Sequence, residues 1–408
     1  MYNSTQKQQM KVIILTGESF PNGMAATNRI KCYARAIKEG GIECEVVIFR
    51  RTEPYGSKPR NTIGQGLFEG IPFRYISGTP LRGSNILIRQ LNDRVDQLRT
   101  DRFLRRVLMK GDILFFYMGG YVHLILRYMK TAHAKGAFCI RDLCELPFCT
   151  EAETKRTIRL RKVTIEKQFP RLDGIISISD ALLNFAKSNT LPTCKHVKVP
   201  IMVEYEHYYI CKKVSDKEIP YIFHAGTLYQ QKDGILGIIE AFGMAKQRLQ
   251  MPIKYILTSS IDASPHANEI RRLINKYQLE DSVEFVGYLV REQIKDYLSK
   301  ASLVISNRPK SEQDYYGFST KIGEYLASGT PLITTNWGEA VNWLKDGESA
   351  YIIEPEDTNA LADTIVQAFS NPDEALKIGR TGQELCQHSF DYRVWSKPLV
   401  DFLQHLGD

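Results

Sequence analysis

The chain has 408 residues, 43% hydrophobic and 25% charged, which allows two or three domains with sizeable cores. No stretch approaches the run of about 20 apolar residues that spans a bilayer, and the N-terminus lacks a signal-peptide core, which favours a cytoplasmic protein. Residues 1–200 hold 33 Lys and Arg against 17 Asp and Glu, a net charge of +16, whereas residues 201–408 hold 21 against 29, a net charge of −8. The basic half suggests an anionic partner: membrane lipid, nucleic acid or acidic glycan.

In the first half, short apolar runs alternate with helical stretches. Strands are predicted at 12–17, 44–49, 113–118, 137–142, 174–179 and 196–200, and helices at 24–39 and 120–135. Most runs are continuously apolar, as in parallel strands covered on both faces. Residues 50–105 are less regular. A helix is expected at 99–110, with apolar residues facing either the core or a membrane surface: Phe103, Leu104, Val107 and Leu108. The basic cluster at 155–162 is expected to be a solvated face.

The second half repeats this alternation after an aperiodic segment at 201–218. Strands are predicted at 221–226, 253–260, 282–287, 303–307, 331–335 and 350–355, and helices at 233–249, 291–301, 319–328 and 358–370. Two runs of βαβ pattern predict an α/β fold of two Rossmann-like domains facing each other across a cleft. We expect the domains at 1–203 and 204–389, with a C-terminal helix in 390–408 returning to the first.

Cysteine and histidine spacing indicates no metal site. The eight cysteines form no Cys-x-x-Cys, and the histidines form neither His-x-x-x-His nor His-Glu-x-x-His. We therefore expect reduced thiols and no metal centre made from protein ligands alone.

The densest polar constellation is SNRPKSEQDYYGFSTKIGEYLASGTPLITT, residues 306–335. A predicted strand ends in a polar loop, and a helix begins near Ser319 or Thr320, either of which can serve as N-cap. Free backbone N–H groups at such a helix start bind phosphate. Lys321 adds a cation, and Glu324, one turn further, is suited to ribose hydroxyls. The alternative is a surface helix with a Lys–Glu pair.

Two further loops follow predicted strands. In FHAGTLYQQKDGILGIIEAF, residues 223–242, a strand ends at Gly226, and Lys232 stands where a helix opens, within reach of a diphosphate. An exposed lysine at a helix start is the alternative. In FPNGMAATNRI, residues 20–30, Gly23 permits a tight turn and a close approach of the backbone to a ligand. This loop lacks the Gly-x-Gly-x-x-Gly pattern of dinucleotide-binding proteins.

The order of these motifs resembles the retaining glycosyltransferases of the GT-B fold, glycosyltransferase family 4, also called glycosyl transferases group 1. The resemblance covers nearly all of 220–370 and, more loosely, the N-terminal half. Its pieces are the Gly-x-Leu loop leading to Lys-x-Gly at 226–234, Phe285-Val286-Gly287, Lys300-Ala301-Ser302, the Gly317-Phe318 turn, Glu324 and Ala327-Ser328-Gly329-Thr330-Pro331. The combination is specific although each piece alone is not.

The resemblance implies a nucleotide-sugar donor site in the second domain. Lys232 is similar to the lysine that contacts the donor diphosphate. Glu324 is similar to the second glutamate of the family's Glu-x7-Glu motif, which holds the donor ribose. The other implied contacts are the loop at Gly226 and Thr227, the base-receiving loop with Tyr288 and Leu289, the turn of Gly317, Phe318, Ser319 and Thr320, and Gly23 facing the diphosphate from the first domain.

This chain departs from the family pattern at two positions. Tyr316 stands where the first glutamate is expected, and Thr227 stands where an arginine is usual. Lys321 or Arg308 would then supply the missing cation, and we place Lys232, Lys321 and Tyr316 at the catalytic centre. Carboxylates that would substitute for the missing glutamate are Glu312 and Asp314.

The resemblance implies an enzyme that moves a sugar from a UDP- or GDP-sugar to a glycan or lipid-linked acceptor. Anomeric retention without a required metal or cofactor is expected, with protein cations stabilising the departing diphosphate. Surface polysaccharide synthesis is the expected role, with peripheral contact to an anionic membrane on its cytoplasmic face. The alternatives are a nucleotide-sugar epimerase on the same fold and an inactive binding homologue. No nucleic-acid recognition motif is evident.

Overall fold

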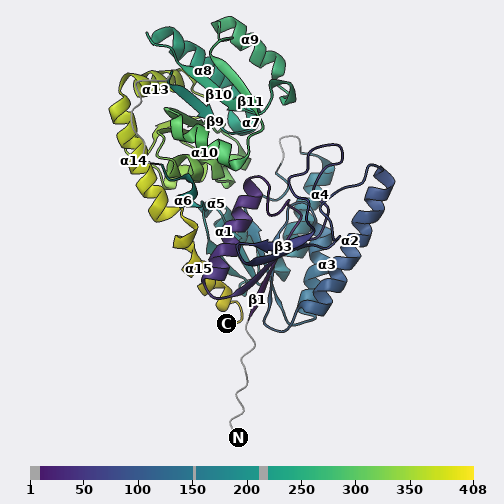
Figure 1. Ribbon diagram of the computed structural model, residues 1–408. Coiled ribbons are helices and arrows are strands. Elements are labelled where there is room, and N and C mark those ends of the chain that lie inside the picture. Colours follow the sequence, from purple (N-terminus) through teal and green to yellow (C-terminus); the bar gives the residue numbers. More distant parts are fainter. Residues whose placement is uncertain (1–9, 150–152, 211–218) are drawn as a thin grey trace. The chain divides into compact units, whose positions relative to one another are not determined.

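The computed structural model describes residues 10–149, 153–210 and 219–408 (Figure 1). The chain forms two compact units: Met1–Met202 together with Tyr392–Asp408, and Val203–Asp391. Each unit holds one sheet with flanking helices, which confirms an α/β fold with two parallel-sheet domains. Among the described helices, none combines the length and the apolar character needed to cross a membrane.

The first unit contains an eight-stranded sheet in the order β3-β4-β2-β1-β5-β6-β7-β8. Neighbouring strands pair in parallel, except for the antiparallel β3–β4 hairpin. The strands are β1 (Lys11–Thr16), β2 (Glu43–Ile48), β3 (Gln65–Phe68), β4 (Ile71–Tyr75), β5 (Ile113–Tyr117), β6 (Phe138–Leu143), β7 (Gly174–Ser177) and β8 (Lys195–Lys198). The central strands are buried almost throughout, which explains their continuously apolar sequences.

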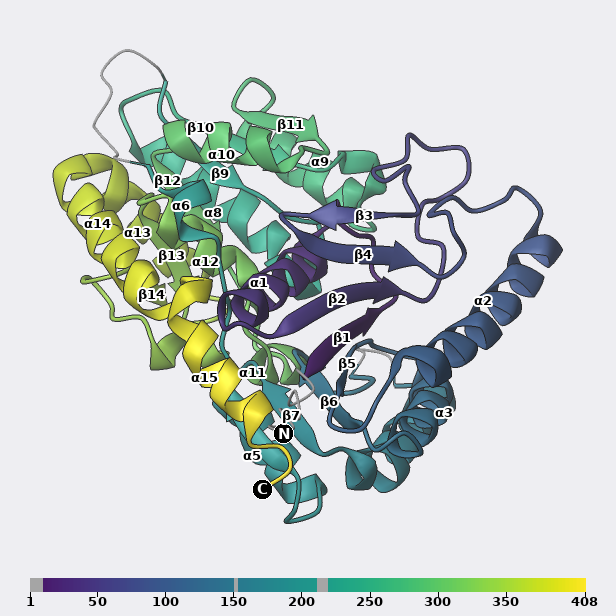
Figure 2. The ribbon, with the colours of Figure 1, turned by 60° about the horizontal axis from the view of Figure 1, so that its bottom comes forward.

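The helices of this unit cover both faces of its sheet. They are α1 (Ala25–Glu39), α2 (Ile86–Val107), α3 (Val122–His133), α4 (Lys155–Val163), α5 (Asp180–Asn189) and α15 (Tyr392–Gln404). Figure 2 shows α1 and α15 on one side of the sheet and α2 and α3 on the other. Helix α15 packs against α1: the Tyr392 hydroxyl donates a hydrogen bond to Glu39 at 2.7 Å, and Val400 lies against Gly40.

The second unit contains a six-stranded parallel sheet in the order β11-β10-β9-β12-β13-β14. The strands are β9 (Tyr221–His224), β10 (Lys254–Thr258), β11 (Val283–Gly287), β12 (Leu303–Ser306), β13 (Leu332–Thr335) and β14 (Tyr351–Ile353). Numbered within the unit, this is the Rossmann order 3-2-1-4-5-6. The order reverses between β9 and β12, where the crossover helices pass to opposite faces and leave a crevice for ligands.

Four helices of the second unit were expected from the sequence, near 233–249, 291–301, 319–328 and 358–370. The helices of this unit are α6 (Tyr205–Tyr208), α7 (Gln230–Asp233), α8 (Ile235–Arg248), α9 (Ala267–Tyr277), α10 (Arg291–Lys300), α11 (Glu312–Tyr316), α12 (Thr320–Ala327), α13 (Thr358–Ser370) and α14 (Pro372–Ser389). The twelve predicted strands and the predicted helices are present, with shifts of a few residues at their ends. The sequence analysis did not predict the β3–β4 hairpin. It also did not predict the helices α4, α5, α9 and α14 or the short helices α6, α7 and α11.

The helix expected at 99–110 is the second half of α2, which begins at Ile86 and ends at Val107. Phe103, Leu104 and Leu108 are at most 8% exposed, so the core-facing interpretation of these residues is confirmed. A membrane-surface role for this apolar side is wrong, because the side is already covered by the protein. The basic cluster 155–162 lies in α4, which buries no residue.

Candidate functional site

The expected donor-site residues of the second unit follow the two strands that flank its topological switch point. The segment from Gly226 to Lys232 follows β9, and the segment from Arg308 to Glu324 follows β12. Because β9 and β12 are parallel neighbours, their carboxyl ends lie at the same edge of the sheet. Two segments about eighty residues apart in sequence are therefore brought together where open α/β sheets bind ligands.

A partly buried ion pair joins these two segments. The Lys321 ammonium, on α12, bonds to the Asp233 carboxylate at the end of α7. Asp233 is 3% exposed and also accepts a hydrogen bond from the Thr227 hydroxyl at 3.1 Å. Burial alone would raise the pKa of Asp233, but the charge of Lys321 and its hydrogen bond outweigh burial and lower it. Asp233 thus stays ionised and holds Lys321 beside the end of β9.

Gly226 lies where this pair and a buried histidine converge. A Cβ at Gly226 would stand 2.8 Å from His224 Nε2, 3.2 Å from Asp233 Oδ1 and closer still to the Lys321 ammonium, so a larger residue would displace these side chains. Burial, and then the charge of Lys321, lower the pKa of His224 to about 4. The imidazole is therefore neutral at neutral pH. The Gly226 N–H donates to the Thr258 hydroxyl at 2.8 Å, which fixes the loop to β10.

The backbone conformation at the last position of the Lys-x-Gly motif favours glycine. Gly234 has φ +58°, a left-handed conformation that strains residues with a Cβ. A Cβ there would also overlap Asn307, whose side-chain amide donates to the Gly234 carbonyl at 3.2 Å. Asn307 follows β12, so this contact is a second link between the ends of β9 and β12.

Arg308 is held by contacts on both sides. Its guanidinium donates to the Lys232 carbonyl at 2.7 Å and pairs with the Asp314 carboxylate. The Ser311 hydroxyl donates to the same carboxylate at 2.7 Å. Asp314 is thus occupied with positioning Arg308. Lys232 itself has an exposed side chain.

The turn before α12 lies close to its expected place. Helix α12 begins at Thr320, with Ser319 at the N-cap position but without a side-chain capping bond. Phe318 is 7% exposed and packs edge-on against Phe390, with ring centroids 5.6 Å apart. Its side chain is therefore part of the core, and its backbone is the part that a ligand would meet. The Gly317 N–H donates to the Gln313 carbonyl at 3.0 Å.

The remaining expected residues lie around this centre. The Tyr316 ring packs edge-on against Tyr315, with centroids 5.3 Å apart. Burial raises the pKa of Tyr208, and the adjacent Glu324, hydrogen-bonded to its hydroxyl, raises it further. Tyr288 is 58% exposed and Leu289 is buried. These two residues follow β11, two strands from β9 and hence about 10 Å away across the sheet.

Gly23 belongs to the first unit, where it follows β1. A Cβ at this position would lie 2.8 Å from Thr27 Cβ and 2.9 Å from the Ser19 carbonyl oxygen. The Thr27 hydroxyl donates to that same carbonyl at 2.7 Å. The loop therefore needs glycine for its own packing. β1 and β5 flank the switch point of the first sheet.

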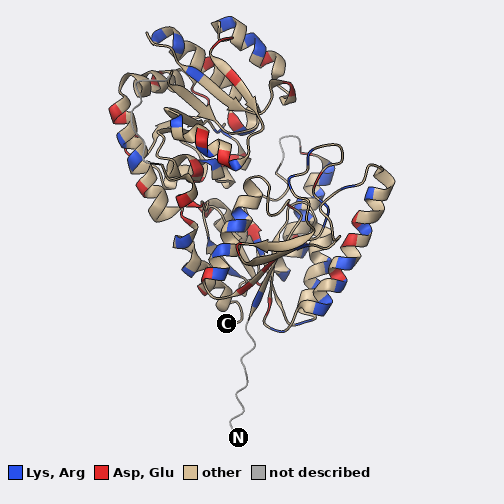
Figure 3. Ribbon diagram, viewed as in Figure 1, with Lys and Arg blue, Asp and Glu red and all other residues tan. Residues whose placement is uncertain are grey.

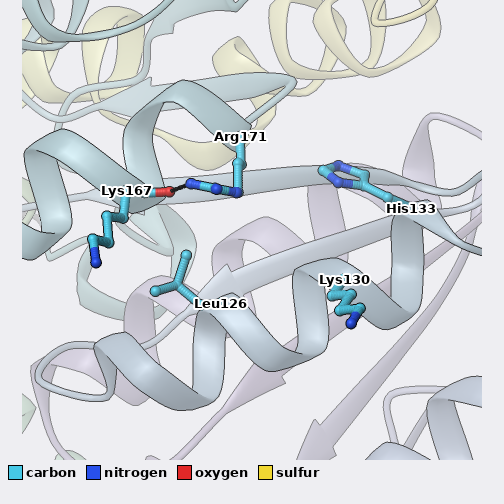
Figure 4. A pocket seen from close by; sticks show the side chains of 5 residues that line it. All are labelled: Leu126, Lys130, His133, Lys167 and Arg171. Atoms are coloured by element: carbon cyan, nitrogen blue, oxygen red, sulfur yellow. Dashed lines mark hydrogen bonds between the residues drawn. The ribbon is translucent and has the colours of Figure 1, made fainter.

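Three potential metal ligands of the first unit also lie close together: His133, Cys139 and Asp173 have ligand atoms within 4.8 Å of one another. Asp173 lies 3.0 Å from His133 Nε2 and accepts the Cys139 N–H at 2.6 Å. Burial raises the pKa of the Cys139 thiol, so the thiol is protonated and a poor ligand. A nearby pocket of about 410 Å³ is shown in Figure 4; it is lined by Leu126, Lys130, His133, Lys167 and Arg171.

Sequence reasoning missed His224, Asp233, Thr258 and Asn307. Asp233 and His224 stand inside the motif that was examined, but their sequence context did not show that they are buried against Lys321. Asn307 ends the predicted strand 303–307, and Thr258 ends β10. A polar residue at the carboxyl end of a strand was the signal that would have found them.

The chain is similar in sequence to known glycosyltransferases. Residues 219–371 match the family model of glycosyl transferases group 1. The chain is 26% identical over 179 residues to the putative colanic acid biosynthesis glycosyltransferase WcaL of Escherichia coli, covering 43% of each chain. It is 28% identical over 138 residues to the mannosylfructose-phosphate synthase of Agrobacterium fabrum, covering 34% of this chain and 29% of that one. The chain thus spans less than half the length of these two curated relatives.

Solved structures share the fold over nearly the whole chain. The sucrose-phosphate synthase of Thermosynechococcus elongatus has a TM-score of 0.74 at 15% identity and covers 98% of this chain and 99% of its own. HepE of Anabaena, solved with UDP, has a TM-score of 0.67 at 15% identity and covers 97% and 99%. The fold is therefore that of the GT-B glycosyltransferases. The match of residues 219–371 to the family model of glycosyl transferases group 1 confirms the resemblance drawn from the motifs.

Proposed function

We propose that the protein transfers a sugar from a UDP- or GDP-sugar to a glycan or lipid-linked acceptor, with retention of anomeric configuration. The observation that carries this proposal is the cluster at the switch point of the second sheet. There the buried Asp233 holds the Lys321 ammonium beside Gly226, at the edge where α/β sheets bind nucleotides. Phosphate groups favour such a combination of fixed cation, close backbone and helix start.

Each residue has a proposed role in donor binding. Lys321 and the exposed Lys232 face the diphosphate and stabilise the charge that it gains as the glycosidic bond breaks. Glu324 accepts hydrogen bonds from the ribose hydroxyls, and the backbone of 317–320 lies along the phosphates and the donor sugar. The base occupies the loop of Tyr288 and Leu289. These roles require no metal ion or other cofactor.

The two departures from the family pattern affect charge. Thr227 replaces an arginine, and its hydroxyl holds the Asp233 carboxylate that in turn holds Lys321. We propose that Lys321 supplies the cation that position 227 lacks. Asp314 is bound to Arg308, so Glu312 is the better candidate for the carboxylate that Tyr316 replaces.

The donor and the pathway are proposed from relatives. HepE was solved with UDP-glucose, and a mycobacterial relative, 20% identical over 146 residues, is a GDP-mannose-dependent mannosyltransferase. WcaL and the amylovoran glycosyltransferase AmsK of Erwinia amylovora take their names from polysaccharide biosynthesis. We propose a role in surface polysaccharide synthesis at the cytoplasmic face of the membrane. Stabilisation against heat by UDP, GDP, ADP or their sugars identifies the base, because a ligand that binds the folded state raises its stability.

A product assay with the selected nucleotide sugar tests the activity. Transfer of sugar to an acceptor, lost in Glu324→Gln and kept in Glu269→Gln, supports the proposal; Glu269 is an exposed glutamate on α9. An altered nucleotide sugar would instead indicate an epimerase. Binding without turnover across a broad acceptor panel would indicate an inactive homologue, to which the residues at 227 and 316 point.

A further inference from the structure

Four large apolar side chains at the start of α2 face solvent. Ile86, Leu87, Ile88 and Leu91 are 61%, 71%, 54% and 62% exposed; we call them the α2 apolar patch. The Asn85 side chain caps this end of the helix by accepting hydrogen bonds from the Leu87 and Ile88 N–H groups at 2.8 and 3.3 Å. The patch is thus held in regular helix. Leu91 lies one turn beyond Leu87 and Ile88, so these three share one side of the helix. Single exposed leucines are ordinary, but such a cluster marks an interaction surface.

The second half of α2 anchors the helix and leaves the patch uncovered. Thr131 on α3 donates to Asp101 at 2.6 Å, and the Tyr128 hydroxyl donates to the Gln97 carbonyl at 3.2 Å. Phe103 and Leu104 are buried in the same half. Figures 1 and 2 show the first turns of α2 extending past α3 and away from the sheet.

The outward face of α2 is also cationic. The helix holds six arginines and three aspartates, and Asp96 and Asp101 are only 0% and 5% exposed. Leu87, Leu91, Arg94, Leu98 and Arg102 recur every three or four residues, so they form one exposed line along the helix. Figure 3 shows Lys and Arg in blue at several positions along α2.

We propose that this outward face of α2 docks on an anionic lipid bilayer. The α2 apolar patch inserts among the headgroups, and the arginines that follow it contact lipid phosphates, as in helices that lie in a membrane interface. The charge argues against a second copy of this chain, because a two-fold contact would set the arginines of one α2 against those of the other. The inference uses no residue of the donor site. It rests on the proposed role at a membrane and names the surface that makes the contact.

Co-sedimentation with vesicles tests the proposal. The full chain binds vesicles that contain both phosphatidylcholine and phosphatidylglycerol but does not bind vesicles of pure phosphatidylcholine. Added salt weakens the binding. Leu87→Ser with Leu91→Ser lowers the partition coefficient at least about tenfold, because less apolar surface is transferred out of water. The matched control is Leu191→Ser, which alters a leucine that is 50% exposed outside α2, and it binds as the wild type does.

A charge series separates docking by α2 from general attraction. Arg94→Gln and Arg102→Gln each lower binding about fivefold, the contribution expected of one cation near an anionic surface. Lys135→Gln and Lys195→Gln, two exposed lysines outside α2, have little effect. Equal losses from both sets, or equal binding to neutral and anionic vesicles, would overturn the proposal.

A spectroscopic variant reports on insertion directly. The emission of Leu91→Trp shifts to the blue with anionic vesicles, whereas that of Leu191→Trp does not. Circular dichroism confirms that the variants are folded, and the exposure of Leu87, Leu91 and Leu191 makes folding defects small. Bilayer docking would be refuted if the emission of Leu91→Trp did not shift. It would also be refuted if sedimentation velocity showed a dimer that the double variant Leu87→Ser with Leu91→Ser abolishes. Nucleotide binding by the docking variants stays at the wild-type level, so this test and that of the proposed function fail separately.

Discussion

The effects of Asp233 and Lys321 on the unfolding free energy should be strongly coupled. Asp233→Asn keeps the shape of the side chain and its contact with Thr227 but leaves the Lys321 ammonium without its carboxylate. Breaking a buried pair costs about 3–5 kcal/mol of unfolding free energy. The side chain of Lys321 is 24% exposed and that of Asp233 is 4% exposed, so water reaches the freed ammonium. We therefore expect a loss near the lower end, about 3 kcal/mol.

A double-mutant cycle isolates this interaction. Lys321→Met alone leaves Asp233 buried and unpaired, whereas Asp233→Asn with Lys321→Met removes both charges. The double variant should be more stable than the sum of the single losses predicts, by at least about 1.5 kcal/mol. Trp337 and Trp343 lie in the second unit and Trp395 in the first. Urea unfolding followed by fluorescence in a Trp395→Phe background therefore reports the second unit alone.

The pH dependence of the Asp233→Asn effect provides an independent check. The pKa of Asp233 is lowered in the folded state, so the unfolded state binds the proton more readily. The stability that this carboxylate contributes is then complete above its unfolded pKa, about 3.9, and is lost as pH falls through the folded value. The difference in unfolding free energy between wild type and Asp233→Asn should be largest at neutral pH and should shrink below about pH 4. If the losses of the two single variants add up to that of the double variant within about 0.5 kcal/mol, the reasoning is refuted. It is also refuted if the difference in unfolding free energy between wild type and Asp233→Asn grows in acid.

Three further results are expected. Lys232→Ala should weaken binding of the selected nucleoside diphosphate by about 1.5–3 kcal/mol in isothermal titration, and Glu324→Gln should weaken it more than it weakens pyrophosphate, which lacks ribose; unchanged affinity in both variants would exclude the donor-site assignment. Gly234→Ala should destabilise the second unit by about 1–3 kcal/mol because of its positive φ and its contact with Asn307. Gly237→Ala, within α8, should be neutral or stabilising, because a Cβ there would make only ordinary van der Waals contacts. Equal effects of the two substitutions on the unfolding free energy would contradict this. His224 has a pKa of about 4 when folded and about 6.5 when unfolded, so its contribution to stability is complete above about pH 6.5 and falls by about 3 kcal/mol toward pH 4; an unfolding free energy as pH-dependent in His224→Phe as in the wild type would show that another group is responsible.

The sequence by itself determined the two-sheet architecture, because buried parallel strands leave continuous apolar runs that need no knowledge of their partners. Runs such as 113–118 and 303–307 became β5 and β12 with nearly the expected ends. The order of short motifs over 220–370 also indicated the family, because glycines and lysines at strand ends are local features. The β3–β4 hairpin was missed, since half of its residues in β3 face solvent and leave no apolar run.

Only the tertiary structure decided which charges act together. Lys321 was expected to share a helix face with Glu324, yet its carboxylate partner Asp233 lies 88 residues away, and no local pattern shows a contact across two strand ends. The same holds for α2, whose sequence contains apolar residues along its whole length. Packing against α3 buries Phe103 and Leu104 but leaves Leu87 and Leu91 in water. Burial depends on what other segments cover, and that is settled only when the chain has folded.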